Sequence, residues 1–174
     1  MNGNRVSGLL LNLWQVMGAA WILQQEQGLI GGGVVADDCG VGKTVSALTA
    51  IKVDADRAKA KAASGEKVTF RPTLILAPSI VVDVWFTECQ QFFPDLLMYR
   101  YFEAKTRVSN LTLRERVLPS NPDHLRRWLE TECPSDDPAT GYKIVVSSYS
   151  TWWQRTLKQQ TTAGSGKPPS VVAR

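Results

Sequence analysis

The chain has 174 residues, 44% of them hydrophobic and 21% charged, so it can bury the core of one ordinary domain. Its formal net charge of +4 is too small to establish a nucleic-acid partner, and its three cysteines form no CxxC pair, which argues against a disulfide framework and a structural zinc site. No apolar run approaches the roughly 18 residues of a membrane span, and polar residues interrupt the apolar stretch after Arg5, so we expect neither a membrane protein nor a secreted one.

The first part of the chain predicts a helix, a short strand and a second helix. Apolar residues recur at helical spacing within residues 9–27, which predicts an amphipathic helix. Residues 34–36 form a short β-branched run that is typical of a buried parallel strand. A second helix is expected over residues 43–63, with an exposed second half rich in Ala and Lys. The apolar stripe of the first helix comprises Leu10, Leu13, Trp14, Met17, Trp21 and Ile22.

The remaining elements also alternate between strands and helices. The predicted strands are residues 73–77, 97–102 and 143–147, and the predicted helices are residues 80–93, 123–130 and 149–158. This alternation predicts an α/β fold, with a parallel sheet flanked by helices.

A phosphate-binding loop is predicted between the strand at residues 34–36 and the helix that follows. Gly40 and Gly42 let the backbone approach a triphosphate, Lys43 would reach its β- and γ-phosphates, and Thr44 would hold Mg²⁺. The general pattern begins with glycine, whereas Asp37 stands at that position. The flanking strand and helix nevertheless provide the context that such a loop needs.

The run of residues 36–44 resembles the first helicase motif of Snf2-type ATPases of helicase superfamily 2, written ADxxGxGKT. That family tolerates Asp at the position of Asp37, and it commonly has Met where Cys39 stands. The resemblance implies a partial RecA-like P-loop domain that binds ATP and Mg²⁺. The residues that it places around the ATP phosphates are Asp38, Cys39, Gly40, Val41, Gly42, Lys43 and Thr44, with Thr44 on the metal.

An upstream segment resembles the family's adenine-binding segment, in which an aromatic–Gln pair precedes a Gly and a Trp. Trp14 and Gln15 occupy the pair, followed by Gly18 and Trp21. The resemblance implies that Trp14 and Gln15 contact adenine, and a side-chain amide suits this role because it offers a donor and an acceptor.

Two later segments are similar to the parts of the family that face the nucleic-acid backbone. Residues 74–79 end in Ala-Pro-Ser, and residues 144–149 end in Ser-Ser-Tyr. The resemblance implies contacts from Ser79 and Ser148 to DNA phosphates. The aromatic residues of the intervening helix, Trp85, Phe92 and Phe93, are expected in the core because aromatic residues at helical spacing usually pack.

Hydrolysis requires an acidic residue for Mg²⁺, a group that orients water and usually an arginine finger. Family members supply these from a DEAH-like motif and from a second RecA-like lobe, but no Asp-Glu pair follows an apolar run here. We therefore expect an N-terminal lobe truncated before that motif, which binds nucleotide without turnover. Double-stranded or nucleosomal DNA and a nuclear location are implied for the full-length relative, with the cytoplasm as the alternative.

The expected organisation has three parts: residues 1–28 with the adenine segment, residues 29–160 as the partial ATP-binding lobe, and residues 161–174 as a flexible Gly/Ser/Pro-rich tail. Two other functions stay open. The chain could be a non-catalytic P-loop nucleotide-binding or interaction module, or a small P-loop kinase. The kinase would need lid arginines and an acceptor site, and it leaves Gln15 unexplained.

Overall fold

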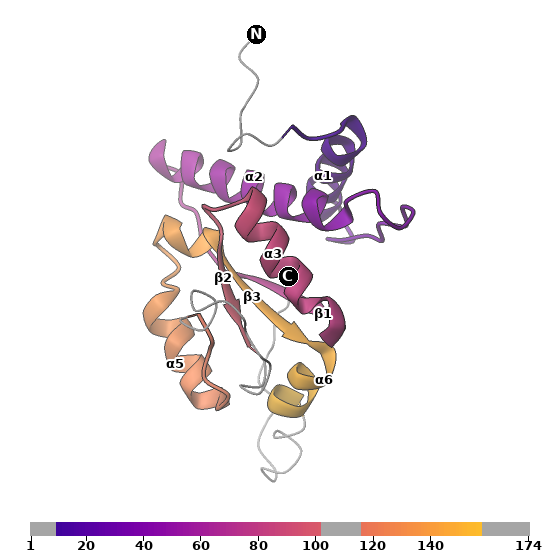
Figure 1. Ribbon diagram of the computed structural model, residues 1–174. Helices are drawn as coiled ribbons and strands as arrows, with labels where there is room; N and C mark the ends of the chain where they lie inside the picture. The colour runs from indigo at the N-terminus through magenta and orange to yellow at the C-terminus, as the bar shows by residue number, and fades with distance from the viewer. Residues whose placement is uncertain (1–9, 102–115, 158–174) are drawn as a thin grey trace.

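The computed structural model describes residues 10–101 and 116–157, which form helices on both sides of a small parallel sheet (Figure 1). The sheet has three strands in the order β1-β3-β2. The expected α/β class, with a parallel sheet flanked by helices, is therefore confirmed. The described elements are α1 (Leu13–Glu26), α2 (Lys43–Ala63), β1 (Thr73–Ala77), the 3₁₀-helix η1 (Ser79–Val81), α3 (Val82–Phe92), β2 (Leu97–Arg100), α5 (Pro122–Glu132), the 3₁₀-helix η2 (Pro138–Tyr142), β3 (Lys143–Ser148), α6 (Tyr149–Trp152) and the π-helical turn η3 (Trp153–Leu157).

Most predicted elements lie close to where the sequence places them. The helices at 43–63 and 123–130 correspond to α2 and α5, and α5 begins after Asn121, whose side chain accepts a hydrogen bond from the Asp123 amide. This contact is an N-cap, which fixes where a helix begins. The predicted ends at residues 102 and 158, and the tail at 161–174, lie outside the described residues.

The sheet separates two apolar clusters because alternate strand residues face opposite sides. On one face, α2 and α3 cover Ile75, Ile144 and Val146, and the helices contribute Leu48 and Phe86 to the same cluster. On the other face, α5 and α6 lie against the strands. The second cluster contains Tyr101, Leu118, Leu125 and Val145, with Tyr99, Trp128 and Trp152 packed against it.

The aromatic residues of the helix after β1 pack as the sequence predicts. Phe93 is fully buried, and Trp85 and Phe92 lie partly buried against the α2–α3 face of the sheet. These side chains therefore stabilise the lobe by packing. The candidate nucleic-acid contact in this part of the chain is Ser79, in the loop after β1.

The predicted strand at residues 34–36 is wrong. Residues 32–38 have no strand pairing, and Val34 is 83% exposed. Within the described part of the chain, β1 and β2 each pair with β3, and neither lies next to this segment. A β-branched run favours extended backbone, but a strand forms only where a neighbour accepts its hydrogen bonds.

The apolar stripe predicted for α1 also differs from the buried face. The helix buries Ala19 and Leu23 against Ala50 of α2, whereas Leu13 and Met17 are exposed. Gly18 lies over Ser46, so the small residues of α1 allow the two helices to approach closely. Ile22 is the member of the stripe that packs against the cluster between α1 and α2, so only part of the stripe faces away from α2. Among the described residues, no helix is both long and apolar enough to cross a membrane.

A polar cluster joins α2 to η2. The Tyr142 hydroxyl donates to Asp56 at 2.7 Å, and the Lys52 ammonium donates to both oxygens of the same carboxylate. Partial burial alone would raise the pKa of Asp56, but these hydrogen bonds and the charges of Lys52 and Lys59 lower it below 3.8. Burial and the Asp56 carboxylate raise the pKa of Tyr142 to about 12.

We expect Tyr142→Phe to lower the free energy of unfolding by about 1 kcal/mol near neutral pH, because it removes one hydrogen bond to a charged acceptor. Because the pKa of Asp56 is lowered in the folded state, its contribution to the free energy of unfolding is present above pH 3.8. That contribution is lost as the pH falls through the folded-state pKa. The raised pKa of Tyr142 means that its contribution is lost as the pH rises from 10 through about 12. Urea unfolding across this range, beside the exposed Tyr149→Phe, measures the difference; equal stability of the two variants at pH 7 would contradict it.

A candidate nucleotide-binding site at the phosphate loop

The loop of residues 37–42 leads directly into the first turn of α2. Gly40 and Gly42 have φ values of 86° and 87°, in the left-handed region that favours glycine. Nothing lies within 4 Å of the position that a Cβ on Gly40 would take, so the backbone there is open to a ligand. Helix α2 is 21 residues long, and its free amide groups give this end a positive potential.

Lys43, the first residue of α2, folds back into the loop. Its ammonium donates to the backbone carbonyls of Asp37 and Asp38, both at 2.8 Å. These carbonyls are neutral acceptors, and a phosphate oxygen would be a stronger one because hydrogen bonds between charged groups are roughly twice as strong. A bound triphosphate could therefore replace the two loop carbonyls as the hydrogen-bond acceptor of the Lys43 ammonium.

The first turn of α1 contacts the same loop. The indole N–H of Trp14 donates to the carbonyl of Val41 at 3.1 Å. The Oε1 atom of Gln15 accepts from the Asn12 amide at 3.0 Å, and its Nε2 atom lies against Gly42 so closely that a Cβ there would overlap it. The two residues that the resemblance assigns to adenine thus lie beside the predicted phosphate loop.

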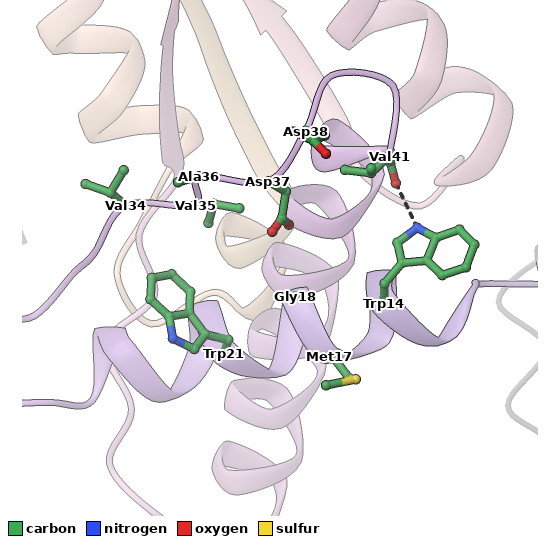
Figure 2. A pocket seen from close by; sticks show the side chains of 10 residues that line it. All are labelled: Trp14, Met17, Gly18, Trp21, Val34, Val35, Ala36, Asp37, Asp38 and Val41. Atoms are coloured by element: carbon green, nitrogen blue, oxygen red, sulfur yellow. Dashed lines mark hydrogen bonds between the residues drawn. The ribbon is translucent and has the colours of Figure 1, made fainter.

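A pocket of about 520 Å³ opens between α1 and the extended segment before the loop. Figure 2 shows Trp21 reaching from α1 toward this segment and Trp14 reaching toward Val41 of the loop. The pocket is large enough for a purine base, and an aromatic wall beside carboxylates is typical of small-molecule sites. Its lining residues are Trp14, Met17, Gly18, Trp21, Val34, Val35, Ala36, Asp37, Asp38 and Val41.

The other predicted loop residues differ in exposure. Asp38 and Cys39 are exposed, whereas Val41 and Thr44 are half-buried. Thr44 follows Lys43 in the first turn of α2, which is where a hydroxyl could reach a metal ion held by a triphosphate. The roles of these residues stay predictions.

The two serines expected to contact DNA lie at the carboxyl ends of β1 and β3, which pair in parallel. Ser79 is exposed at the start of η1. Ser148 is buried, and its hydroxyl caps α6 by accepting from the Thr151 amide at 3.1 Å. Ser79 could therefore meet a phosphate directly, while the hydroxyl of Ser148 is already engaged.

Sequence reasoning did not assign several lining residues to the site. Met17 and Trp21 belong to the apolar stripe predicted together with Trp14, and Gly18 lies four residues after Trp14, so helical spacing was the signal for this face. Asp37 contacts Lys43 through its backbone carbonyl. Every residue type has such a carbonyl, so the sequence could not indicate this contact.

Comparisons with known proteins identify the family of the chain. A family model described as "SNF2-related domain" matches residues 14–166. The chromatin-remodeling ATPase INO80 of Arabidopsis thaliana is 28% identical over 140 residues, which is 80% of this chain and 8% of that protein. The ATP-dependent helicase rhp16 of Schizosaccharomyces pombe is 34% identical over 79 residues, or 44% of this chain and 8% of that protein.

Among solved structures, the Sulfolobus solfataricus SWI2/SNF2 ATPase core in complex with dsDNA is 20% identical, with a TM-score of 0.49, over 84% of this chain and 23% of that chain. The chain spans about 8% of the length of the curated relatives above. The family match covers most of the chain, because it begins in the first turn of α1 and continues beyond β3. This chain therefore belongs to the SNF2-related domain family, and it corresponds to the N-terminal lobe of a Snf2-type ATPase of helicase superfamily 2.

Proposed function

We propose that the chain binds ATP with Mg²⁺ at the phosphate loop, as the nucleotide-binding part of a Snf2-like DNA-dependent ATPase. The observation that carries the proposal is the Lys43 ammonium held inside a loop with two left-handed glycines at the start of a long helix. The residues present fit the ligand, because Gly40 is open to it and the free amides of α2 point toward its charge.

The roles of the side chains follow from this placement. Lys43 would leave the two loop carbonyls and bind phosphate oxygens, and Thr44 would ligate Mg²⁺. Asp38, Cys39 and Val41 would contribute backbone groups around the phosphates. Bound Mg²⁺ supplies charge neutralisation at the β- and γ-phosphates.

Adenine would occupy the pocket beside Trp14. Gln15, which lies against Gly42, would reach the base from the neighbouring position of α1. In this arrangement the Gln15 amide exchanges its hydrogen bond with the Asn12 amide for one with the base. The exchange makes nucleotide selectivity testable, because a guanine edge presents a different order of donors and acceptors.

The whole protein would be a chromatin remodeller that uses ATP to move along double-stranded or nucleosomal DNA in the nucleus. Support comes from the relatives, which are named as chromatin-remodeling ATPases. Ser79 would contact the DNA backbone. Ser148 would orient the neighbouring turn through its cap of α6, or would contact the DNA backbone after releasing that cap. The hydrolytic acidic motif and a second RecA-like lobe would be needed for turnover, so this chain by itself would bind nucleotide without hydrolysing it.

The proposal is tested by titrating the whole chain with fluorescent ATP and GTP analogues in Mg²⁺. We expect saturable binding of the ATP analogue. Gln15→Ala should weaken it roughly three- to tenfold, the effect of one lost hydrogen bond, and leave the GTP analogue unchanged. Gln24→Ala, an exposed glutamine of the same helix, serves as the control. A folded chain that binds neither analogue refutes the proposal.

The alternative is a non-catalytic nucleotide-binding or interaction module, which the lack of an Asp-Glu pair after an apolar run favours over a kinase. The two candidates predict different results when the acidic motif and a second RecA-like lobe are supplied. Addition of double-stranded DNA and a separately expressed polypeptide that carries the acidic motif and the second lobe would produce phosphate release from a remodeller lobe, and would produce none from a binding module.

A further inference from the structure

Two consecutive residues at the start of α1 contact two consecutive residues of the phosphate loop. Trp14 donates its indole proton to the Val41 carbonyl, and Gln15 lies against Gly42. The contacts join segments 27 residues apart in the sequence. Trp14 and Gln15 therefore contact the two residues that share one peptide group, Val41 and Gly42. Both contacts come from the start of α1.

A peptide group is planar and trans, so its N–H points opposite to its C=O. Because Trp14 holds the Val41 carbonyl toward α1, the Gly42 amide proton must point away from α1. Figure 2 shows this indole-to-carbonyl contact at the edge of the pocket. The left-handed conformation of Gly42 then leads into Lys43, whose side chain lies inside the loop.

We propose that Trp14 is a positioning residue for phosphate, which fixes the direction of the Gly42 amide through the Val41 carbonyl. This inference rests on the proposed nucleotide-binding function and separates two roles for one side chain. Trp14 lines the pocket with its ring, but its N–H acts on the loop. A phenylalanine would keep the ring and lose only the action on the loop.

The inference explains why the contact needs an indole. A tyrosine hydroxyl or a phenylalanine ring cannot present an N–H at the same place on the ring edge, and Trp offers one donor with no acceptor. The backbone carbonyl of Val41 is a matching acceptor, and it accepts from the indole N–H at 3.1 Å. Gln15 completes the arrangement by limiting the space around the Gly42 Cα.

The test compares Trp14→Phe with wild type against three probes: the ATP analogue, inorganic tripolyphosphate and adenosine. We expect tripolyphosphate and the ATP analogue to bind about three- to tenfold more weakly to the variant, the effect of one lost hydrogen bond, while adenosine binding is unchanged. Trp153→Phe, which removes an exposed indole far along the chain, should bind all three probes as wild type does. Thermal unfolding of both variants checks that the fold is intact.

Equal tripolyphosphate affinity for Trp14→Phe and wild type would overturn the inference, and so would a loss confined to adenosine, since that would assign the side chain to the base alone. A second measurement does not depend on nucleotide. In ¹H–¹⁵N spectra of the free chain, the Gly42 amide peak should move or broaden in Trp14→Phe and stay in place in Trp153→Phe. A wild-type chain that binds no probe refutes the proposed function, while the Gly42 peak still decides whether Trp14 orients the loop.

Discussion

Replacing Lys43 by Ala is expected to weaken binding of the ATP analogue by about 100-fold or more. The ammonium is the one side-chain cation that the described structure places inside the phosphate loop, where it is held by two carbonyls. Its loss would remove one or two charge-assisted hydrogen bonds to phosphate, each worth about 1.5–3 kcal/mol. A loss of about 2.7 kcal/mol corresponds to the 100-fold change.

The matched control is Lys67→Ala, which removes the same charge from an exposed position. Lys43 begins α2 and Lys67 follows its other end, and the helix itself is about 30 Å long because its 21 residues each rise about 1.5 Å. Calorimetric titration of both variants with the ATP analogue gives the comparison. If Lys43→Ala bound within threefold of Lys67→Ala, the loop would not be the site of phosphate recognition.

Replacing Asp83 by Ala is expected to lower the free energy of unfolding by about 2–3 kcal/mol. The guanidinium of Arg100 is 2% exposed and donates to Asp83 at 2.6 Å, with its charge also over the ring of Phe86 at 4.4 Å. Removing one partner of a fully buried pair costs about 3–5 kcal/mol, and we expect a smaller loss than that because Asp83 is 65% exposed. The midpoint of thermal unfolding should fall by about 4–12 °C.

Two further variants separate the lost charge pair from a general effect. Asp95→Ala removes a 71% exposed carboxylate that lies 3.9 Å from Lys52, and it should cost under about 1 kcal/mol. The double variant Asp83→Ala/Arg100→Met should recover part of the loss, because an apolar side chain can pack on Phe86 without an unpaired charge. Equal costs for Asp83→Ala and Asp95→Ala would show that Arg100 does not depend on its carboxylate.

The features that the sequence predicted well are those encoded locally. Helix α2 begins at Lys43, directly after the glycine loop, as predicted, and the predicted helix at 123–130 lies within α5. The role of the loop in phosphate binding stays a prediction. The strands at 73–77 and 143–147 are also local, because each is a short, largely apolar run, and Pro78 ends the first of them. The division into residues 1–28, 29–160 and 161–174 stays a prediction.

The features that the sequence did not predict depend on partners far along the chain. Residues 34–36 have the composition of a strand, but pairing depends on a neighbour that local sequence cannot supply. The same holds for the bond between Trp14 and Val41 and for the ion pair between Asp83 and Arg100. The apolar stripe of α1 was readable as a pattern, yet the surface that it faces is set by tertiary packing.

The position of the phosphate loop outside the three-stranded sheet has a consequence for its local stability. Backbone amides in β3 hydrogen-bond to strands on both sides, so they should exchange with solvent deuterium through global unfolding alone. Residues 32–38 have no strand pairing, and their amides can open without disturbing the core. A ligand that binds only the closed loop raises the opening free energy by RT ln(1 + [L]/Kd), about 2.7 kcal/mol at 100 times Kd. Bound nucleotide would then stabilise residues 32–38 in the way that a paired strand stabilises its neighbour. Hydrogen exchange would show slower exchange only at the few residues that contact the nucleotide.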